Sequence, residues 1–419
     1  MTEPTSNRGR RLRTFAALRH RNYRLFFAGQ LISVTGTWMQ NMALSYLTYH
    51  LTNSAFLLGL ISTIGSLPML LFALPGGVLA DRVEKRRILL FTQSSVMVLA
   101  FILAALTGAH WIRVWQIALI AALAGTAMAA DMPTRQAFVI EMVDRRDLMN
   151  AIALNSSIFN SARIAGPSIA GILYGIVGPA WCFFANGVSF IAVLIGLLLM
   201  RFPPRARRQI TTSPFADALD GLRHLRQNRT VLGIAIWLGV FSIFGWSYAV
   251  LMPIFARDVL HMGPIGLGYL MTATGAGALI GALSVATLSS YNIPRPTLLF
   301  AGAFMLAAAL IGFSFSRTFW LSAPLLALAG MGGVTFTSTA NTTIQVSVPD
   351  ELRGRMMGVW GVVFAGSAPL GSLQAGTMAQ YLGAPTAVLI GALITVAATM
   401  AALVALRRRA RGSAQSETE

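Results

Sequence analysis

The feature that most constrains this chain is a series of apolar runs, each about as long as a membrane is thick. A helix needs about 20 mostly apolar residues to cross the hydrocarbon core of a bilayer. Twelve such runs occur, at approximately residues 24–48, 55–80, 88–108, 114–134, 150–174, 180–201, 230–254, 265–289, 297–315, 320–341, 355–378 and 384–406. The sequence therefore predicts an all-α polytopic membrane protein with twelve transmembrane helices.

The composition excludes a soluble protein. Hydrophobic residues make up 55% of the 419 residues and charged residues only 11%, whereas soluble proteins carry about 25% charged residues. The longest polar segment separates the runs into two sets of six. We expect the following organisation: N-terminal tail 1–23, N-terminal half 24–201, central loop 202–229, C-terminal half 230–406 and C-terminal tail 407–419. Within the loop, DALDGLRHLRQ predicts a short amphipathic helix on the membrane surface.

The positions of the cations predict the orientation. Of the 32 lysines and arginines, 28 lie in the tails and in alternate loops on one side, whereas Arg113, Arg257 and Arg317 lie on the other side. Cytoplasmic loops are rich in such residues, so both termini are expected in the cytoplasm. A net charge of +18 could indicate nucleic-acid binding. Because the cations are spread over alternate loops, we expect no nucleic-acid partner.

The sequence carries no pattern typical of an enzyme. It has no nucleophile–base set, no metal-ligand cluster and no phosphate-binding loop, and its one cysteine, Cys182, lies in an apolar run. The Gly-x-Gly of residues 274–281 follows no strand and lies within a span, which favours helix packing over nucleotide binding. We therefore expect no catalytic residue, no metal site and no cofactor.

An internal repeat relates the two sets of six spans. Residues 143–171 align without a gap on residues 348–376, at a shift of 205, and Trp38 matches Trp246 at 208. The identical small residues in the alignment are Gly166 and Gly371, Ala170 and Ala375, and Gly171 and Gly376. We infer two pseudo-symmetric six-helix halves. In transporters built this way, the substrate site lies near the bilayer midplane between the halves.

Two motifs resemble the major facilitator superfamily. GGVLADRVEKRR, residues 76–87, resembles the loop between spans two and three of that family, with Glu84 where the family has glycine. AGPSIAG, residues 165–171, resembles the fifth-span motif of the family's exporters, with Ala170 in place of the first paired glycine. The loop matches at Gly77, Asp81, Arg82, Lys85 and Arg86, and the fifth-span motif comprises Arg163, Gly166, Pro167 and Gly171.

The chain as a whole is similar to one branch of this superfamily. RHRNYRLFFAGQLIS and PTRQAFVIEMVDRRDLMNAIALNS resemble bacterial exporters of siderophores and macrolides, the enterobactin exporter type. The resemblance implies secondary active efflux of an amphipathic small molecule by alternating access, with proton antiport, from a monomer in the bacterial cytoplasmic membrane. An importer of a small metabolite and a transporter-like sensor that moves nothing remain as alternatives.

The loop after span two has two interpretations. A pseudo-twofold arrangement sets Asp81 against the start of span eleven, near Met356, where its carboxylate meets the positive end of a helix dipole. The resemblance implies a cytoplasmic latch, formed by Gly77, Asp81, Arg82 and Arg86, that breaks when the cytoplasmic side opens. Alternatively, the basic residues only set the topology.

Arg163 is a cation inside span five, next to the helix-bending pair Gly166 and Pro167. It lies about 13 residues, or roughly 20 Å, along a span whose hydrocarbon core is about 30 Å thick. A charge at this depth usually faces the bundle interior. Asp131, the one acidic residue near a span, is expected too close to the cytoplasmic end to pair with it. Arg163 therefore faces polar groups of neighbouring helices or an anionic substrate.

Asp131 is the candidate proton site, because burial favours protonation of a carboxylate. It can equally pair with Arg135 or cap the next segment. The first span of each three-helix repeat is expected to line the substrate cavity. Aromatic rings, amides and one cation suit a large amphipathic substrate. The predicted lining residues are Gln30, Trp38, Gln40, Asn41, Arg163, Trp246, Tyr248 and Asn341.

The latch leads to a first prediction. Asp81→Asn removes the charge that faces the helix dipole, so it should slow or abolish transport while the protein stays in the membrane. Transport and membrane abundance are measured in parallel. Normal transport by this variant would show that Asp81 does not form part of a latch.

Overall fold

The structure, a computed structural model, describes residues 15–202, 223, 229–291 and 293–416, and this part of the chain is helical without strands. The N-terminal half comprises a 3₁₀ turn, η1 (Ala16–Arg19), and α1 (Arg21–Thr52), α2 (Ala55–Arg82), α3 (Lys85–Gly108), α4 (Val114–Met142), α5 (Leu148–Val177) and α6 (Pro179–Leu199). The C-terminal half comprises α8 (Arg229–Val240), η2 (Phe241–Gly245), α9 (Tyr248–Ile254), η3 (Phe255–Val259), α10 (Gly263–Leu288), η4 (Ser289–Tyr291), α11 (Arg295–Phe315), α12 (Phe319–Val346), α13 (Asp350–Leu382) and α14 (Ala384–Ser416).

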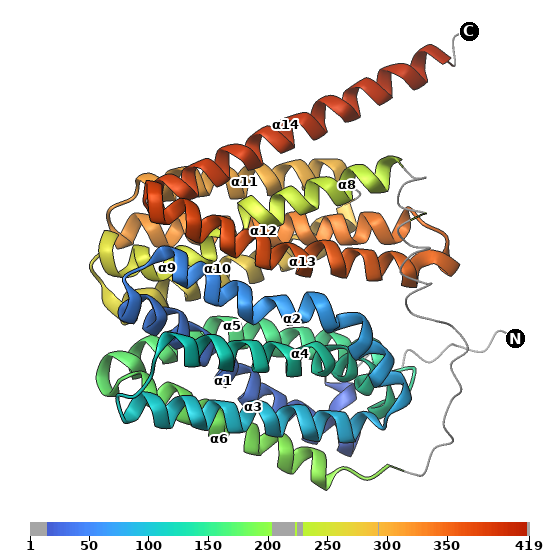
Figure 1. Cartoon of the computed structure of the whole chain (residues 1–419). Coiled ribbons are helices and arrows are strands. Elements are labelled where there is room, and N and C mark those ends of the chain that lie inside the picture. Colours follow the sequence, from blue (N-terminus) through green and yellow to red (C-terminus); the bar gives the residue numbers. More distant parts are fainter. Residues whose placement is uncertain (1–14, 203–222, 224–228, 292, 417–419) are drawn as a thin grey trace, which may run out of the picture.

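The helices form two bundles that lie side by side (Figure 1). One bundle contains α1 to α6 and the other α8 to α14, and the segment from α8 to η3 makes one traversal interrupted by the π-helical turns η2 and η3. This confirms the predicted fold of twelve traversals in two halves. We call the end of the bundles where α1 begins and α14 ends the terminal face, and the other end the distal face. The helix predicted for DALDGLRHLRQ falls outside the described residues, and α14 continues into the predicted tail as far as Ser416.

Ten of the twelve traversals are long and apolar enough to cross a membrane by hydropathy alone, and α1 and α5 are the exceptions. Of the residues predicted to line the cavity, α1 carries Gln30, Trp38, Gln40 and Asn41, and α5 carries Arg163. They pack against each other, and α5 also packs against α10 of the other half. Polar groups within a bilayer are costly unless they face the protein interior. The least apolar helices are therefore the ones at the centre.

The repeat is visible in the backbone at the distal face. Gly178 ends α5 with φ +90°, and Gly383 ends α13 with φ +83°. The two glycines are 205 positions apart, the shift found in the sequence. Residues with a Cβ rarely adopt these angles, and glycine adopts them without strain. Each glycine lets the chain reverse within one residue, because α6 begins at Pro179 and α14 at Ala384.

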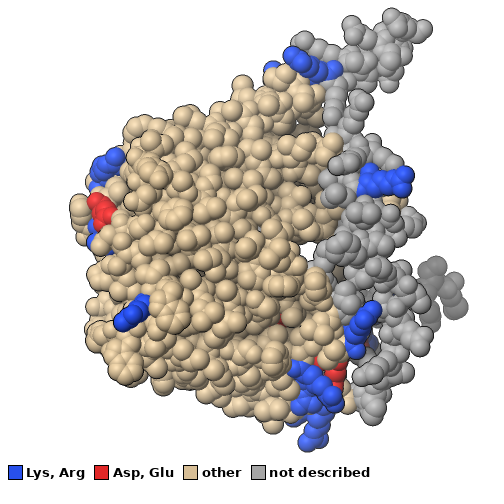
Figure 2. All heavy atoms as spheres, viewed as in Figure 1, with Lys and Arg blue, Asp and Glu red and all other residues tan. Residues whose placement is uncertain are grey.

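Charged side chains lie at the two ends of the bundles, and a broad band without them runs between the ends (Figure 2). This band has the pattern of a surface that faces lipid. At the terminal face, arginines also donate hydrogen bonds to backbone carbonyls at the C-terminal end of α6. Arg21 Nη1 donates to the Leu199 carbonyl at 3.0 Å, and Arg86 Nε donates to the Leu197 carbonyl at 2.7 Å. Cations at this position satisfy orphan carbonyls and complement the helix dipole.

Glycines allow the helices within the C-terminal half to pack with backbones touching. Gly277 of α10 lies against the Ala327 carbonyl of α12, and a Cβ at Gly281 would lie 3.0 Å from Cα of Met331. Small residues at helix interfaces are the usual means of close association in membranes. A side chain at Gly277 would have to displace backbone, which cannot move locally.

This packing gives a second prediction. Gly277→Ala should lower the free energy of unfolding by about 1–3 kcal/mol, because it overpacks the α10–α12 contact. Gly358→Ala is the matched control, since no heavy atom lies within 4 Å of a Cβ built there. Thermal unfolding of both purified variants in detergent measures the difference. Equal melting temperatures would contradict the close contact.

Candidate functional site

The seam between the two halves is closed toward the distal face. A Cβ at Gly376 of α13 would lie 2.8 Å from Cα of Gly59 on α2. A Cβ at Gly171 of α5 would lie 3.1 Å from Cα of Gly268 on α10. The hydroxyl of Thr63 also donates to the Pro369 carbonyl across the seam, at 2.9 Å. Two pairs of helices, α2 with α13 and α5 with α10, thus meet backbone to backbone.

The same pairs separate toward the terminal face. On α2, no heavy atom of the described residues lies within 4 Å of a Cβ built at Gly77. The same holds on α13 for Gly354, Gly358 and Gly361. On α5, the side chain of Phe159 is exposed. The space between the halves therefore opens toward the terminal face and is sealed toward the distal face.

A polar cluster joins the halves at the distal face. The Tyr49 hydroxyl of α1 donates to the carboxylate of Asp258, and Arg257 Nη1 donates to the Tyr49 carbonyl at 3.4 Å. The Arg257 guanidinium also lies 5.2 Å from the centroid of the Tyr49 ring, within the range of a cation–π contact. Nearby, the Gln380 side chain accepts from the Ser54 hydroxyl at 2.9 Å. We call Tyr49, Arg257 and Asp258 the distal clamp.

Arg163 lies where the close contact between α5 and α10 ends. It is near the middle of α5, and a Cβ at Gly275 of α10 would lie 3.0 Å from its carbonyl oxygen. Its Nη2 donates to Asn160 Oδ1 at 3.1 Å, whereas its buried Nε has no hydrogen-bond partner among the described residues. Tyr248 of the other half is buried, and the Thr274 hydroxyl of α10 donates to the Leu270 carbonyl at 3.0 Å. A buried donor without a partner among the described residues thus lies in the middle of the membrane, at the seam.

Asp131 lies fully buried in α4, closer to the terminal face. Its carboxylate accepts hydrogen bonds from Thr92 Oγ1 at 2.9 Å and Gln93 Nε2 at 2.7 Å, both on α3. Arg135 Nε, one turn along α4, donates at 3.0 Å, and Arg135 Nη1 continues to Gln30 Oε1 at 2.9 Å. Of the alternatives for Asp131, the structure has the pair with Arg135. Gln30 belongs to this polar network of α1, α3 and α4, and is itself buried.

Two predicted lining residues, Trp38 and Asn41, lie on α1, and Trp38 contacts α5 near Arg163. The Trp38 ring packs edge-on against Phe159, with centroids 5.6 Å apart, and a Cβ at Gly166 would lie 2.5 Å from the Trp38 Cβ. Gly166 thus lets α1 pack closely on α5, whereas the carbonyl of its neighbour Pro167 faces Gly268 of α10. Asn41, further along α1, is exposed.

The remaining predicted lining residues have other partners. Gln40 is buried, and its Oε1 accepts from Asn186 Nδ2 of α6 at 2.8 Å. Trp246 packs edge-on against Phe364 of α13, with centroids 6.5 Å apart. Asn341 of α12 accepts from Gln345 on its own helix at 3.1 Å. Gln40 therefore braces α1 on α6, whereas Trp246 and Asn341 are half-buried.

The predicted latch residues lie at the end of α2 and the start of α3. Arg82, the last residue of α2, is exposed, and Arg86 caps α6 as described above. The side chain of Asp81 is outside the described residues. The distal clamp was not foreseen from the sequence. Its only signal was the adjacent Arg257 and Asp258 at the end of the seventh span.

The chain is similar to known transport proteins along most of its length. The profile of a family described as a transmembrane secretion effector matches residues 12–418. The staphyloferrin A transporter of Staphylococcus aureus is 26% identical over 381 residues, which are 90% of this chain and 94% of that protein. The enterobactin exporter EntS of Shigella boydii is 28% identical over 404 residues, 93% of each protein. The multidrug efflux pump Tap of Mycolicibacterium fortuitum is 26% identical over 368 residues, 86% of this chain and 89% of that protein.

Solved structures share the fold. A bacterial homologue of the human lysosomal transporter Spinster, in an inward-facing and unoccupied conformation, superposes with a TM-score of 0.77 at 14% identity, covering 92% of this chain and 97% of that one. A POT family transporter in complex with 5-aminolevulinic acid gives a TM-score of 0.75 at 12% identity, covering 92% and 96%. At these identities, the likeness concerns the fold alone.

The distal clamp gives a third prediction. Asp258→Asn weakens a charge-assisted hydrogen bond, so the distal side should open in a larger fraction of molecules, by about tenfold. The readout is the labelling rate by a water-soluble maleimide of a cysteine at Ile265, next to the seam, in a Cys182→Ser background. Asp144→Asn, which removes a carboxylate at the terminal face, is the control. If both variants label at the parent rate, the clamp does not hold the seam.

Proposed function

Because the chain belongs to the MFS_3 family of transmembrane secretion effectors, we propose that it exports an amphipathic small molecule by alternating access, with protons entering in exchange. The family and its relatives are transporters of the major facilitator superfamily and not enzymes. The chain is a multi-pass membrane transporter of this superfamily. We place it in the bacterial cytoplasmic membrane as a monomer.

The observation that carries the proposal is the free donor of Arg163 at the seam. An arginine in the middle of a membrane is costly, and such residues commonly mark substrate pathways. Its Nε is buried and has no hydrogen-bond partner among the described residues, and the space between the halves opens further toward the terminal face. A substrate that carries an anionic or strongly accepting group would satisfy this donor. Staphyloferrin A and enterobactin, named for two relatives, indicate siderophores as one substrate class, and Tap indicates drugs.

The seam supports alternating access. In the orientation indicated by the arginines, the terminal face is cytoplasmic, so the described conformation admits substrate from the cytoplasm. Release outside requires the glycine contacts of α2 with α13 and of α5 with α10 to separate, and the distal clamp to break. The terminal face must close in exchange. The latch at Gly77, Asp81, Arg82 and Arg86 is then the contact that re-forms on the cytoplasmic side.

Asp131 is our candidate for the proton site. It is a fully buried carboxylate among the described residues of the spans, and its ion pair with Arg135 is linked to α1 through Gln30. Protonation would neutralise the carboxylate and weaken its hold on Arg135. Because Gln30 lies on the helix that also carries Trp38, release of Arg135 can be transmitted to the substrate cavity. Import of a small metabolite and sensing without transport are the competing functions.

A fourth prediction tests export and its energy source. In bacteria without their own exporters, the wild type should reduce accumulation of at least one of a catecholate siderophore and a macrolide. Arg163→Ala should raise that accumulation about tenfold, since a charged hydrogen bond to substrate is lost. Arg145→Ala, which removes an exposed arginine at the terminal face, is the control and should behave as the wild type.

Each alternative has its own outcome in this assay. A protonophore should abolish efflux by the wild type. The Asp131→Asn variant should retain only a low rate of efflux, and a protonophore should not change that rate. Higher accumulation in the wild type than in cells without the protein would indicate import. Ligand binding without flux in proteoliposomes would indicate a sensor. Efflux that continues unchanged with a protonophore would exclude proton antiport.

A further inference from the structure

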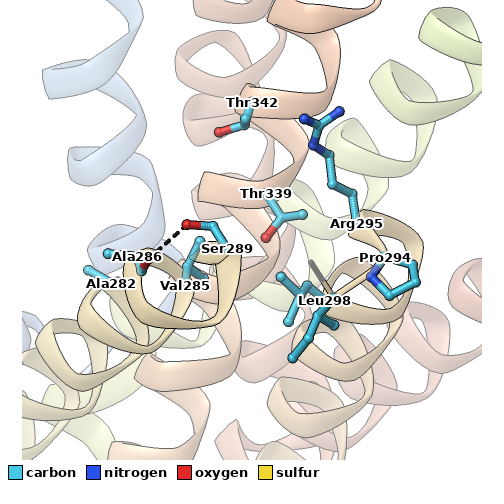
Figure 3. Close-up of a pocket in the computed structure, with 10 residues that line it drawn as sticks. Ala282, Val285, Ala286, Ser289, Pro294, Arg295, Leu298, Thr339 and Thr342 are labelled. Atoms are coloured by element: carbon cyan, nitrogen blue, oxygen red, sulfur yellow. Dashed lines mark hydrogen bonds between the residues drawn. The ribbon is translucent and has the colours of Figure 1, made fainter. Parts of the chain in front are cut away.

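A second opening lies within the C-terminal half, at the terminal face. It has a volume of about 590 Å³ and lies between α10, α11 and α12. Ligand pockets commonly fall in the range of about 300–1,000 Å³. Its walls are mostly apolar, formed by Ala282, Val285 and Ala286 of α10, by Ile293 and Pro294 before α11, and by Leu298 of α11. The polar and cationic groups among the described lining residues, which include no carboxylate, are Ser289, Arg295, Thr339 and Thr342 (Figure 3).

The deepest polar group is the hydroxyl of Thr339. The residue is only 3% exposed, and its Oγ1 has no hydrogen-bond partner in the part of the chain that the structure describes. On the same helix, the Thr337, Thr342 and Thr343 hydroxyls each donate to the carbonyl four residues earlier. This hydrogen bond to the carbonyl one turn earlier is the usual one for a threonine in a membrane helix. Thr339 does not use it, so its hydroxyl remains free to bind a ligand.

The residue that corresponds to Thr339 in the N-terminal half has a paired hydroxyl. The repeat shift of 205 takes Thr339 to Thr134 of α4, which is fully buried and donates to the Ala130 carbonyl at 2.6 Å. There, Asp131, Thr92 and Gln93 form the buried network between α3 and α4. The matching space of the C-terminal half holds a pocket instead. The two halves have therefore diverged at this site, one toward an internal network and the other toward an opening.

Arg295 supplies the charge at the mouth of the pocket. It is the first residue of α11, is exposed, and makes no ion pair or hydrogen bond with any described residue. In Figure 3, its side chain extends from the start of α11 alongside α12, past Thr339 and to the level of Thr342. Pro294 and Pro296 flank it and have no N–H to offer. The guanidinium is thus the main donor available to a ligand at this end of α11.

The chemistry of these groups selects one kind of ligand. A guanidinium binds a phosphate through paired N–H donors, and hydroxyl groups donate hydrogen bonds to the remaining phosphate oxygens. The apolar walls suit hydrocarbon next to that phosphate. Thr339 lies seven residues before the end of α12 at Val346, or about 10 Å along the helix axis. That depth corresponds to the boundary between headgroups and acyl chains, where basic pockets between transmembrane helices bind anionic lipids.

We propose that the pocket between α10, α11 and α12 binds a phosphate group, with Arg295 pairing with the phosphate and Thr339 donating a hydrogen bond from below. The phosphate is carried by an anionic phospholipid of the adjoining leaflet or is free in solution. The site is separate from Arg163, and it does not depend on the proposed transport function. An occupied pocket ties α11 to α10 and α12, and so stabilises the C-terminal half.

The test uses the purified full chain and native mass spectrometry with phosphatidylglycerol, phosphatidylethanolamine or inorganic phosphate. Phosphatidylglycerol should bind the wild type and raise its melting temperature. Arg295→Gln and Thr339→Val should each weaken that binding about tenfold. Thr339→Ser keeps the hydroxyl and should bind as the wild type. Arg408→Gln, which removes an exposed arginine near the end of α14 at the same face, is the matched control.

The outcomes are distinct. A rise in melting temperature with inorganic phosphate alone, lost in Arg295→Gln, supports the site and identifies free phosphate as its source. The same dependence with phosphatidylglycerol only identifies the lipid. Equal losses in Arg295→Gln and Arg408→Gln would show that surface charge in general attracts the lipid, and would overturn the proposal. Unchanged binding by Thr339→Val, or by all variants, would overturn it as well.

Discussion

The absence of hydrogen-bonding partners in a bilayer is the constraint on which the rest of this structure depends. Every backbone group within the hydrocarbon must be paired inside the chain, and helices meet that requirement one by one. Polar side chains must likewise be kept away from lipid, and here many of them lie on α1 and α5 at the centre of the molecule. Those two helices are the ones that hydropathy alone does not identify as spans. The need to hide polar groups from lipid therefore also creates the polar interior that a transporter requires.

The second organising feature is the contrast along the seam between the halves. Toward the distal face, glycines bring α2 onto α13 and α5 onto α10, and the distal clamp adds hydrogen bonds from Tyr49 to Asp258 and from Arg257 to Tyr49 across the halves. Toward the terminal face, a Cβ built at Gly77 of α2, or at Gly354, Gly358 or Gly361 of α13, would have no described neighbour within 4 Å. Small residues permit close contact without enforcing it, so the same surfaces can separate with little rearrangement. Arg163 lies between the closed and the open part of the seam, and its Nε has no hydrogen-bond partner among the described residues.

The halves are related by the repeat but are not equivalent. Gly178 and Gly383 keep the same backbone turn 205 residues apart. Other positions have changed: Arg163 falls on Ala368, and the Asp131 network has a pocket as its counterpart. These packing glycines are thus shared, whereas Arg163 and Asp131 have no charged counterpart in the other half. Our proposals of a proton site in one half and a phosphate site in the other rest on this asymmetry.

The number of spans, their division into halves and the position of Arg163 along span five could be predicted from the sequence. These follow from local properties: run length, charge in the loops and a rise of about 1.5 Å per residue. It also left open, correctly, whether Asp131 pairs with Arg135.

The packing of the helices was needed to show that Gln30 joins this pair, that Gln40 contacts α6, that Tyr49 meets Asp258, and which end of the seam is open. The physical reason is that partners depend on how each helix is rotated and where it crosses its neighbours. Those quantities are set by the packing of the whole bundle and leave no local trace in the chain.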